Sequence, residues 1–592
     1  MRNIYILLAL LTGPMAFGQT VNLNHVSSFS TGIFDEGASE ILSYHSGNQT
    51  IYFSNADANS IGRLDISNPA QPSLLGYIDC SPYGGGVNSV VAASNFIAVA
   101  VEDTLKQNPG FIVFFDLNGN YLNQVQVGAL PDMVGVNSTE TFLVSANEGE
   151  PSDDYANDPL GSVSIIDLAL GVSNLTQAQV TTLDFSSFTA QDLDSSVRIF
   201  GNNGQSSIAQ DLEPEYIAFH PSLPEAYVVC QENNAVIRFN LLTKSLVSIK
   251  GLGFKDHSLP GNGFDASDKD GQIDIQPRPV LGMYQPDAFK SASIAGTPYF
   301  FTANEGDARD YDGYSEEERV KDLILDSSSY PNASSLQADA NLGRLKTTSA
   351  NGDVDGDGDF DQIYSYGARS FSIWDENMNL IYDSGDELES ILAQEEPSHF
   401  NSTNDDNDSF DNRSDDKGPE PEAIEHGSFG GMDLLFVAAE RHGGLFMFDV
   451  SNPNAPVFLE FENNRNFALP ADDSNAGDLG PEDIVFVSGN DSPVLGTPMV
   501  LVANEVSGTI SLFELSQVLG LDEAEVELAV YPNPAQDFLM INARGWVEII
   551  TNQGQVVKQT YTQDGRIDVQ DLPSGFYMVR TKTGKPSRFV KQ

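Results

Sequence analysis

Cysteine is nearly absent from this sequence, since its 592 residues include only Cys80 and Cys230. Both lie in or beside apolar segments that are far apart in the chain, so we expect two buried free thiols and no disulfide framework. A chain of this length buries enough apolar surface to fold without covalent cross-links. No run approaches the roughly eighteen apolar residues of a membrane-spanning helix, so the sequence predicts no transmembrane segment.

Positive charge is scarce as well. Lysine and arginine number 29 against 85 aspartates and glutamates, which gives a formal net charge of −56. This acidity disfavours nucleic acids and anionic membrane surfaces as partners. It favours cation binding, and the alternative is that most of the carboxylates only keep the surface solvated.

Several catalytic signatures are missing. The chain has no Gly-x-Ser-x-Gly elbow, no His-Glu-x-x-His, no P-loop and no paired Cys-x-x-Cys. Nucleophilic hydrolases and zinc enzymes therefore have no support in the sequence.

The N-terminus carries a targeting pattern. Arg2 precedes the apolar run 4–11, and Ala16 and Gly18 offer the small residues that a signal peptidase reads. We expect a signal peptide over residues 1–18, cleaved before Gln19, and therefore an exported protein.

One pattern recurs seven times along the chain. It reads Pro-Glu or Pro-Asp, a short apolar segment, a gap, and an apolar run that ends in Ala-Asn-Glu or a near variant. In the fourth copy, turn residues separate four apolar segments, 215–219, 226–230, 235–239 and 245–249. Repeats of several short strands are typical of β-propellers, so we predict an all-β fold with a seven-bladed propeller over residues 25–515.

The repeat also predicts where function lies. In a four-stranded blade, the start of the first strand and the end of the second lie on the same face, so that face collects the acidic positions of every repeat. The insertions 149–160, 255–285 and 306–367 fall on the same face, and long loops of this kind often carry function. The alternative is that the acidic side chains only accept hydrogen bonds from neighbouring blades. The residues expected near one end of the central channel are Glu40, Asn88, Asp132, Glu215, Asp287, Glu422 and Glu482.

The C-terminal region differs from the rest in charge and pattern. After a linker over residues 516–528, residues 529–592 contain several short strands and read as a small Ig-like β-sandwich. The motifs at 531–534, 552–555, 572–577 and 588–592 resemble the type A C-terminal sorting domain of the type IX secretion system. The resemblance implies that the type IX machinery is a partner, that the protein crosses the outer membrane, and that the tail is then removed. The rest would be released or fixed to surface polysaccharide.

The propeller resembles a second family. The repeated units, the loop 255–271 and the segment 304–311 are similar to the choice-of-anchor I domain over about residues 25–515. The resemblance implies an extracellular propeller whose relatives carry assorted surface anchors. Some members carry alkaline-phosphatase-like labels.

An acidic loop predicts a calcium site. Its carboxylates stand at positions 1, 3, 5, 7 and 9 with Gly358 at position 6, where a sharp turn is needed. Position 12 is Tyr364 in place of the bidentate glutamate of an EF-hand, which predicts weak binding. The proposed calcium ligands are Asp353, Asp355, Asp357, Asp359 and Asp361, with Asp268 and Asp270 in a second, less complete loop. The alternative is that both loops are merely acidic and solvated.

Two functions remain open from the sequence. The first is a secreted or cell-surface calcium-binding propeller that binds an extracellular ligand. The alternative is a calcium-dependent phosphoesterase, in which carboxylates of the acidic face hold calcium ions and nearby arginines neutralise charge on phosphate. Alternatively, these cationic side chains only form ion pairs with carboxylates of the acidic ring. The candidate catalytic residues are Glu148, Glu305, Asp307, Arg309, Glu440, Arg441, His442 and His257.

Overall fold

The computed structural model describes residues 19–519, 528, 530–541, 545–551, 556–562, 565–570, 572–581 and 587–592. The chain divides into two compact units, of which one comprises residues 21–517 and the other contains the C-terminal residues from 518. The predicted signal peptide and most of the predicted linker lie outside the described residues. Within the described residues, no helix is long and apolar enough to cross a membrane.

The large unit is built from four-stranded antiparallel sheets, and the first four of them follow chain order. They are β2 (Leu42–His45), β3 (Thr50–Asn55), β4 (Ser60–Asp65) and β5 (Ser73–Asp79); β6 (Val87–Ala92), β7 (Ile97–Val101), β8 (Pro109–Phe115) and β9 (Tyr121–Ala129); β10 (Pro131–Val136), β11 (Phe142–Asn147), β12 (Ser162–Asp167) and β13 (Val180–Asp184); and β14 (Ile217–Phe219), β15 (Glu225–Cys230), β16 (Ala235–Asn240) and β17 (Ser245–Gly251).

Three further four-stranded sheets follow, and the last of them joins the two ends of the unit. In it, the N-terminal strand β1 pairs with β35. The three sheets are β20 (Phe289–Ile294), β21 (Thr297–Asn304), β27 (Ser370–Trp374) and β28 (Leu380–Asp383); β29 (Pro421–Phe429), β30 (Met432–Ala439), β31 (Leu445–Asp449) and β32 (Val457–Glu462); and β33 (Pro481–Val487), β34 (Met499–Asn504), β35 (Thr509–Leu519) and β1 (Gln19–Ser30).

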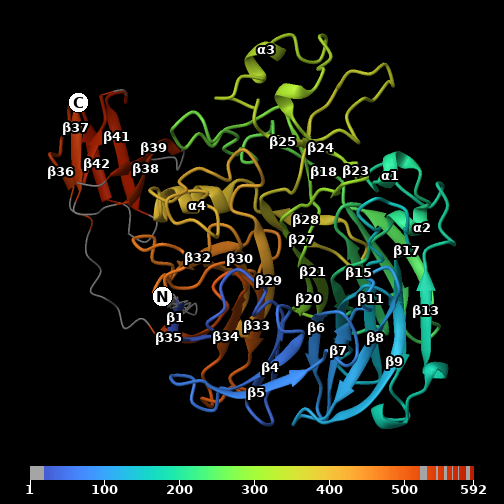
Figure 1. Ribbon diagram of the computed structural model, residues 1–592. Helices are drawn as coiled ribbons and strands as arrows, with labels where there is room; N and C mark the ends of the chain where they lie inside the picture. The colour runs from blue at the N-terminus through green and yellow to red at the C-terminus, as the bar shows by residue number, and fades with distance from the viewer. Residues whose placement is uncertain are drawn as a thin grey trace, which may run out of the picture. The chain divides into compact units, whose positions relative to one another are not determined.

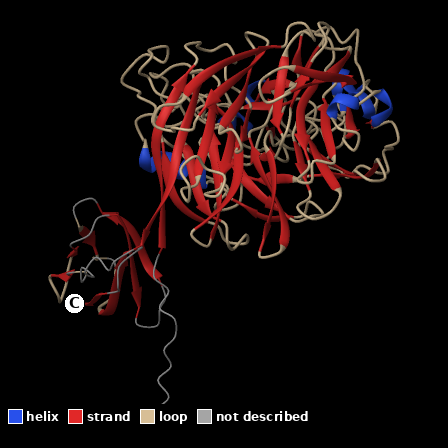
Figure 2. Cartoon of the chain, turned by 90° about the horizontal axis from the view of Figure 1, so that it is seen from below, coloured by secondary structure: helices blue, strands red, loops and turns tan. Residues whose placement is uncertain are grey.

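The sheets follow one another around a closed circle (Figure 1). The first strand of each sheet contacts the first strand of the next, from β2 through β6, β10, β14, β20 and β29 to β33, and β33 contacts β2 again. Strands dominate the drawing, and helices are few and short (Figure 2). The predicted all-β propeller is confirmed, whereas the count of seven blades stays a prediction.

Burial along the strands explains why the repeat is so apolar. The middle strands β3, β7 and β15 are buried along nearly their whole length, because both of their faces pack against neighbouring sheets. The outer strand β5 is mostly exposed. Cys80 and Cys230 are buried free thiols, as expected from their apolar surroundings.

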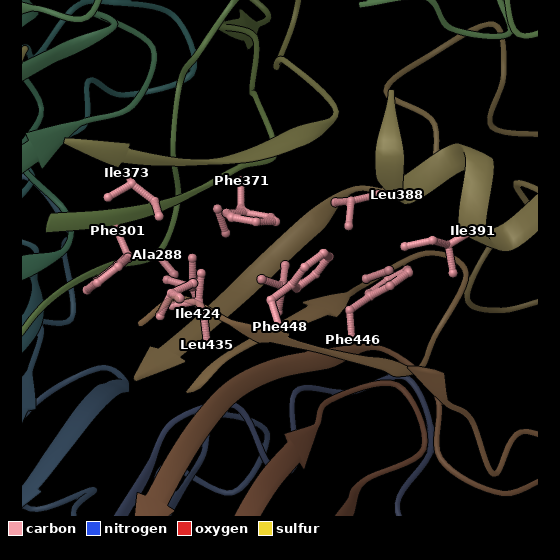
Figure 3. Packing of buried hydrophobic residues seen from close by; sticks show 14 of the residues in the cluster. Ala288, Phe301, Phe371, Ile373, Leu388, Ile391, Ile424, Leu435, Phe446 and Phe448 are labelled. Atoms are coloured by element: carbon pink, nitrogen blue, oxygen red, sulfur yellow. The ribbon is translucent and has the colours of Figure 1, made fainter. Parts of the chain in front are cut away.

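Cores lie between adjacent sheets. Between the fifth and sixth sheets, Phe301 and Phe371 pack against Phe446 and Phe448 (Figure 3). The helix α4 (Glu387–Glu395) caps this core with Leu388 and other apolar side chains. This packing fixes the spacing of the two sheets whose ends carry part of the acidic face.

The long insertions are folded. The insertion 306–367 contains α3 (Ala333–Leu336) and the 3-10 turn η3 (Val320–Asp322). The strands of the insertions are β18 (Phe254–Asp256), β19 (Leu281–Met283), β22 (Asp310–Tyr311), β23 (Tyr314–Ser315), β24 (Glu317–Arg319), β25 (Lys346–Thr348) and β26 (Tyr364–Ser365). The helices α1 (Gly201–Gly204) and α2 (Ile208–Asp211) and the 3-10 turns η1 (Val172–Asn174) and η2 (Gln177–Gln179) lie outside these insertions, between β12 and β14. Phe264 and Val280 of one insertion share a core with Val320 and Leu342 of another.

The small unit forms two sheets around one core. One sheet holds β36 (Val530–Tyr531), β37 (Phe538–Ile541) and β40 (Arg566–Asp568). The other holds β38 (Gly545–Thr551), β39 (Val556–Thr562), β41 (Gly575–Thr581) and β42 (Ser587–Lys591). Leu539, Val547, Ile567 and Val579 belong to the shared core, so the tail is a β-sandwich with an apolar interior of its own.

Candidate functional site: an acidic channel mouth

Six of the seven predicted head residues are carboxylates that act on one another. Burial raises the pKa of each, and the charges of other acidic groups raise the pKa further, as Asp132 does for Glu40 and Glu482 does for Glu422. The exception, Asn88, donates a hydrogen bond to the carbonyl of Pro131 at 3.0 Å. We call the end of the channel where these carboxylates meet the channel mouth. The six are Glu40, Asp132, Glu215, Asp287, Glu422 and Glu482.

Three of the strands that carry these residues share a backbone irregularity. In β10, β29 and β33 the strand register shifts immediately after the proline of the repeat. Such a bulge bends a strand and re-aims its side chains. The acidic residue after each proline lies inside this irregular segment.

A second backbone feature joins the two halves of the repeat. Leu130, Gln285 and Glu420 directly precede prolines of the repeat and have φ of 46°, 40° and 55°, a strained conformation for residues with side chains. The carbonyl of Leu130 accepts a hydrogen bond from the backbone N–H of Glu148 at 2.8 Å, and that of Glu420 accepts one from Glu440 at 2.8 Å. The Pro-Glu and Ala-Asn-Glu motifs are therefore partners in one local structure.

One half of the mouth is a cavity of about 360 Å³. Within it, Glu215 and Glu232 are 8% and 7% exposed, their carboxyl groups contact each other, and one oxygen of each accepts from no donor among the described residues. Burial and the charge of Asp307 raise the pKa of Glu232 to about 8. The lining residues are Asp132, Glu148, Glu150, Glu215, Gln231, Glu232, Asp287, Asp307, Ala308, Asp310 and Tyr311.

The other half of the mouth is charge-compensated. Glu420 is fully buried and lies within 2.6 Å of Arg413 and 3.1 Å of both Lys417 and Arg441. Burial alone would raise the pKa of Glu420, but these three cations hold it well below its usual range. Lys417 also pairs with Glu305.

Two groups of carboxylates in the mouth have a spacing suited to one cation. Oxygens of Asp287, Glu305 and Glu422 lie within 4.8 Å of one another, and the same holds for Glu305, Glu420 and Glu440. The first group joins two neighbouring sheets, because Asp287 and Glu305 flank the β20–β21 pair and Glu422 lies in β29.

The candidate catalytic carboxylates lie at the mouth, whereas the candidate cations are engaged in ion pairs. Glu148 and Asp307 line the cavity. Arg309 is buried against Asp211 and lies 3.2 Å from Glu213. Arg441 contacts Glu420 and Glu440 at 3.1 and 3.0 Å.

Both candidate histidines are buried in structural contacts. A ring nitrogen of His257 lies 2.7 Å from the Asn262 carbonyl, and the ring packs against Phe264. His442 lies 2.8 Å from a carboxylate oxygen of Glu396. Burial lowers the pKa of both rings. In the described chain, the cavity lining contains no histidine or arginine, so the geometry adds no support to a phosphoesterase.

Carboxylates of the predicted calcium loop belong to two acidic groups, the second of which also includes Asp326 from outside the loop. Oxygens of Asp353, Asp355 and Asp357 lie within 4.8 Å of one another, as do those of Asp326, Asp359 and Asp361. Asp353 accepts hydrogen bonds from the backbone of Gly356 at 2.8 Å and Gly358 at 3.1 Å, so the loop is already turned around its first carboxylate.

The second predicted loop is arranged differently. Asp268 binds Arg344 at 2.5 Å and contacts Lys269, which neutralises its charge. Asp270 accepts a hydrogen bond from the backbone of Gln272 at 3.0 Å. Neither residue belongs to a cation-sized acidic group among the described residues.

Residues that sequence reasoning missed include Glu150, Tyr311 and Lys417. The first two lie in insertions, where the repeat does not indicate which residues reach the channel mouth. Lys417 had a signal, because it is a rare basic residue three positions before Glu420 and close to the Pro421-Glu422 pair.

Comparison with known proteins gives relatives for the propeller. Gigasin-3a of Magallana gigas is 33% identical over 211 residues, which cover 34% of this chain and 70% of that protein. The mesenchyme-specific cell surface glycoprotein of Strongylocentrotus purpuratus is 26% identical over 301 residues, 44% of this chain and 37% of that protein. The chain thus spans only about a third of the second relative.

Similar solved structures are distant. A streptogramin B lyase is 10% identical with a TM-score of 0.40, over 85% of this chain and 100% of that one. The β-propeller domain of Cps50 (Swd1) from Myceliophteria thermophila is 7% identical with a TM-score of 0.39, over 84% and 100%.

Family models match both units. The secretion system C-terminal sorting domain matches residues 529–592, which assigns the tail to the type IX secretion system and identifies an exported protein. The choice-of-anchor I domain matches residues 40–453. Because that match covers most of the chain and coincides with the propeller, the protein belongs to the choice-of-anchor I family.

Proposed function

We propose that this exported propeller binds an extracellular ligand by taking a positively charged group, an ammonium or guanidinium, into the cavity of the channel mouth. The observation that carries the proposal is the pair of buried acidic residues Glu215 and Glu232, whose carboxyl groups contact each other and each keep an oxygen that accepts from no donor among the described residues. Buried polar atoms are normally hydrogen-bonded, so an unpartnered carboxylate beside a cavity favours a ligand that donates protons.

The size of the cavity supports an organic group. Its volume of about 360 Å³ falls in the range of small-molecule pockets, roughly 300–1,000 Å³. Tyr311 adds an aromatic ring to the lining, and aromatic faces attract ammonium and guanidinium groups. A ligand with two or more amines would match several carboxylates at once.

The test is calorimetric titration of the full chain with spermidine, in chelator and at physiological salt. We expect replacement of Glu215 and Glu232 by glutamine to weaken binding at least about tenfold, the effect of losing roughly 1.4 kcal/mol. Glu482→Gln is the matched control, because this ring carboxylate does not line the cavity and should retain near-native affinity. Equal affinity in the cavity double variant and the wild type would refute the proposal.

We also propose that calcium binds the loop 353–361 and stabilises the folded protein. Replacing Asp353 and Asp357 by alanine is expected to remove the calcium-dependent gain in stability that this loop provides. For calcium at roughly ten to a hundred times its dissociation constant, that gain is about 1–3 kcal/mol, because an ion that binds only the folded form stabilises it by mass action. Thermal unfolding of both proteins, with and without about 1 mM calcium, measures it.

The control for this prediction is Asp405→Ala with Asp408→Ala, which removes two exposed carboxylates from another acidic loop. It should keep the calcium response. If calorimetry finds the Asp353/Asp357 variant binding as many calcium ions as the wild type with unchanged affinities, the loop is only a solvated acidic insertion.

A further inference from the structure

The carboxylates at the junction of the fifth and sixth sheets form a second kind of site in the mouth. Asp287 stands before β20, Glu305 directly follows β21, and Glu422 lies at the start of β29. The contacts of β29 with β20 and β21 hold these three residues together. Their position therefore depends on rigid strands.

Glu422 is the member that points to a bound ligand. It is 6% exposed, its carboxyl contacts that of Asp287, and its Oε2 accepts from no donor among the described residues. The oxygens of the three carboxyl groups lie within 4.8 Å of one another. Because calcium–oxygen distances of about 2.3–2.6 Å place two ligands of one ion at most about 5 Å apart, this spacing fits a single ion.

Charge around the group is incompletely balanced. Glu305 contacts Lys417 and accepts a hydrogen bond from Gln231 at 2.8 Å. Lys417 is shared, because it also lies 3.1 Å from Glu420 and donates to the carbonyl of Gly306 at 2.6 Å. Three carboxyl groups thus share one ammonium that is divided among several acceptors, so a divalent cation that replaces their protons meets negative charge that Lys417 does not balance.

We infer that Asp287, Glu305 and Glu422 bind one hard divalent cation of the calcium class in the channel mouth. All three ligands are carboxylates, which suit calcium, magnesium or manganese better than metals that prefer sulfur or nitrogen. The site shares Asp287 with the adjacent cavity, but Glu305 and Glu422 do not line that cavity, so Glu422 tests cation binding separately from amine binding.

The experiment is calorimetric titration with calcium of the full chain carrying Asp353→Ala and Asp357→Ala, so that the loop does not contribute. Adding Glu422→Gln should remove one calcium equivalent or weaken that site at least tenfold, and Asp287→Asn should do the same. The calcium-free Glu422→Gln protein should melt no lower than its parent, since glutamine keeps the size of the side chain and no described donor loses an acceptor at Oε2. Its calcium-induced rise in melting temperature should shrink.

Glu482→Gln is the matched control, because it occupies the equivalent position in β33 outside the three-carboxylate group. This variant should bind the same number of calcium ions as its parent. The inference is overturned if Glu422→Gln and Asp287→Asn bind calcium like their parent. It is also overturned if Glu482→Gln loses as much calcium binding as these two variants do, because calcium would then be attracted by the acidic ring as a whole. Glu422→Gln should leave spermidine affinity near native, so this test and that of the cavity give separable results.

Discussion

Deletion of residues 530–592 is expected to leave the propeller folded and to reduce its extracellular amount to near zero. The tail has an apolar core of its own, with Leu539, Ile549 and Val579 among its members, so its loss exposes no propeller core that it would otherwise fill. The sorting domain is the part recognised by the type IX secretion machinery. Immunoblots of periplasmic and culture fractions measure the distribution.

The control for this deletion is transfer of residues 530–592 to an unrelated folded protein that carries a signal peptide. That fusion should leave the periplasm. Wild-type extracellular levels of the truncated propeller would contradict the sorting role. Circular dichroism of the truncated protein should retain the strand signal, which separates failed export from failed folding.

In chelator, the propeller is expected to lose stability as pH rises from about 6.5 to 8. Burial, together with neighbouring negative charges, raises the pKa of Glu40 and Glu232 to about 8 and that of Asp287 to about 7. In the unfolded chain the same groups titrate near 4. The folded state therefore binds more protons in this range, and a state that binds more protons loses stability as pH rises through its own pKa.

The magnitude follows from the number of groups. One unit of pKa difference corresponds to about 1.4 kcal/mol, so several carboxyls deprotonating together should lower the free energy of unfolding by roughly 3–6 kcal/mol. Buried His426 and His442 have lowered pKa values, which reduce stability toward acid pH instead. This opposing effect fades above about pH 7.5, where the histidines are mostly neutral in both states, so the upper part of the window reports mainly on the carboxyls.

Chemical denaturation at fixed temperature measures this pH profile. Glutamine at positions 40 and 232 cannot titrate, so the double variant should show a shallower decline. Divalent cations should restore stability at pH 8 if they replace protons among the carboxylates. A flat or rising profile in chelator would contradict the idea that the mouth holds its carboxyls protonated.

Sequence periodicity was a reliable guide wherever local pattern controls structure. The strand segments 226–230 and 235–239 correspond closely to β15 (Glu225–Cys230) and β16 (Ala235–Asn240). Runs of apolar and β-branched residues between turn residues favour strands whatever surrounds them. The predicted first strand at 215–219 is shorter in the structure, as β14 (Ile217–Phe219), because Glu215 and Tyr216 lie in the irregular segment at the mouth.

In the insertions, the local sequence did not predict which side chains contact each other. Arg309 lies four residues after Glu305 of the Ala-Asn-Glu motif and was a candidate either to hold an anionic group or to pair within the acidic ring, and it is buried in contact with Asp211 and Glu213. Asp211 and Arg309 are 98 residues apart, and nothing in their local sequences signals the pairing. Burial of one charge demands a partner charge, and only the packing of two distant segments supplies it.

By itself, the sequence determined the class of fold, the acidic head of each repeat and the identity of the tail, because these depend on periodicity and on short contiguous motifs. Only the tertiary structure decided which carboxylates meet and which are neutralised. Glu215 and Glu232 keep unpartnered oxygens beside a cavity, whereas Glu420 is surrounded by Arg413, Lys417 and Arg441. The same residue type thus becomes a candidate ligand or a buried ion-pair partner, because the pKa and charge balance of a carboxyl depend on neighbours brought together across sheets.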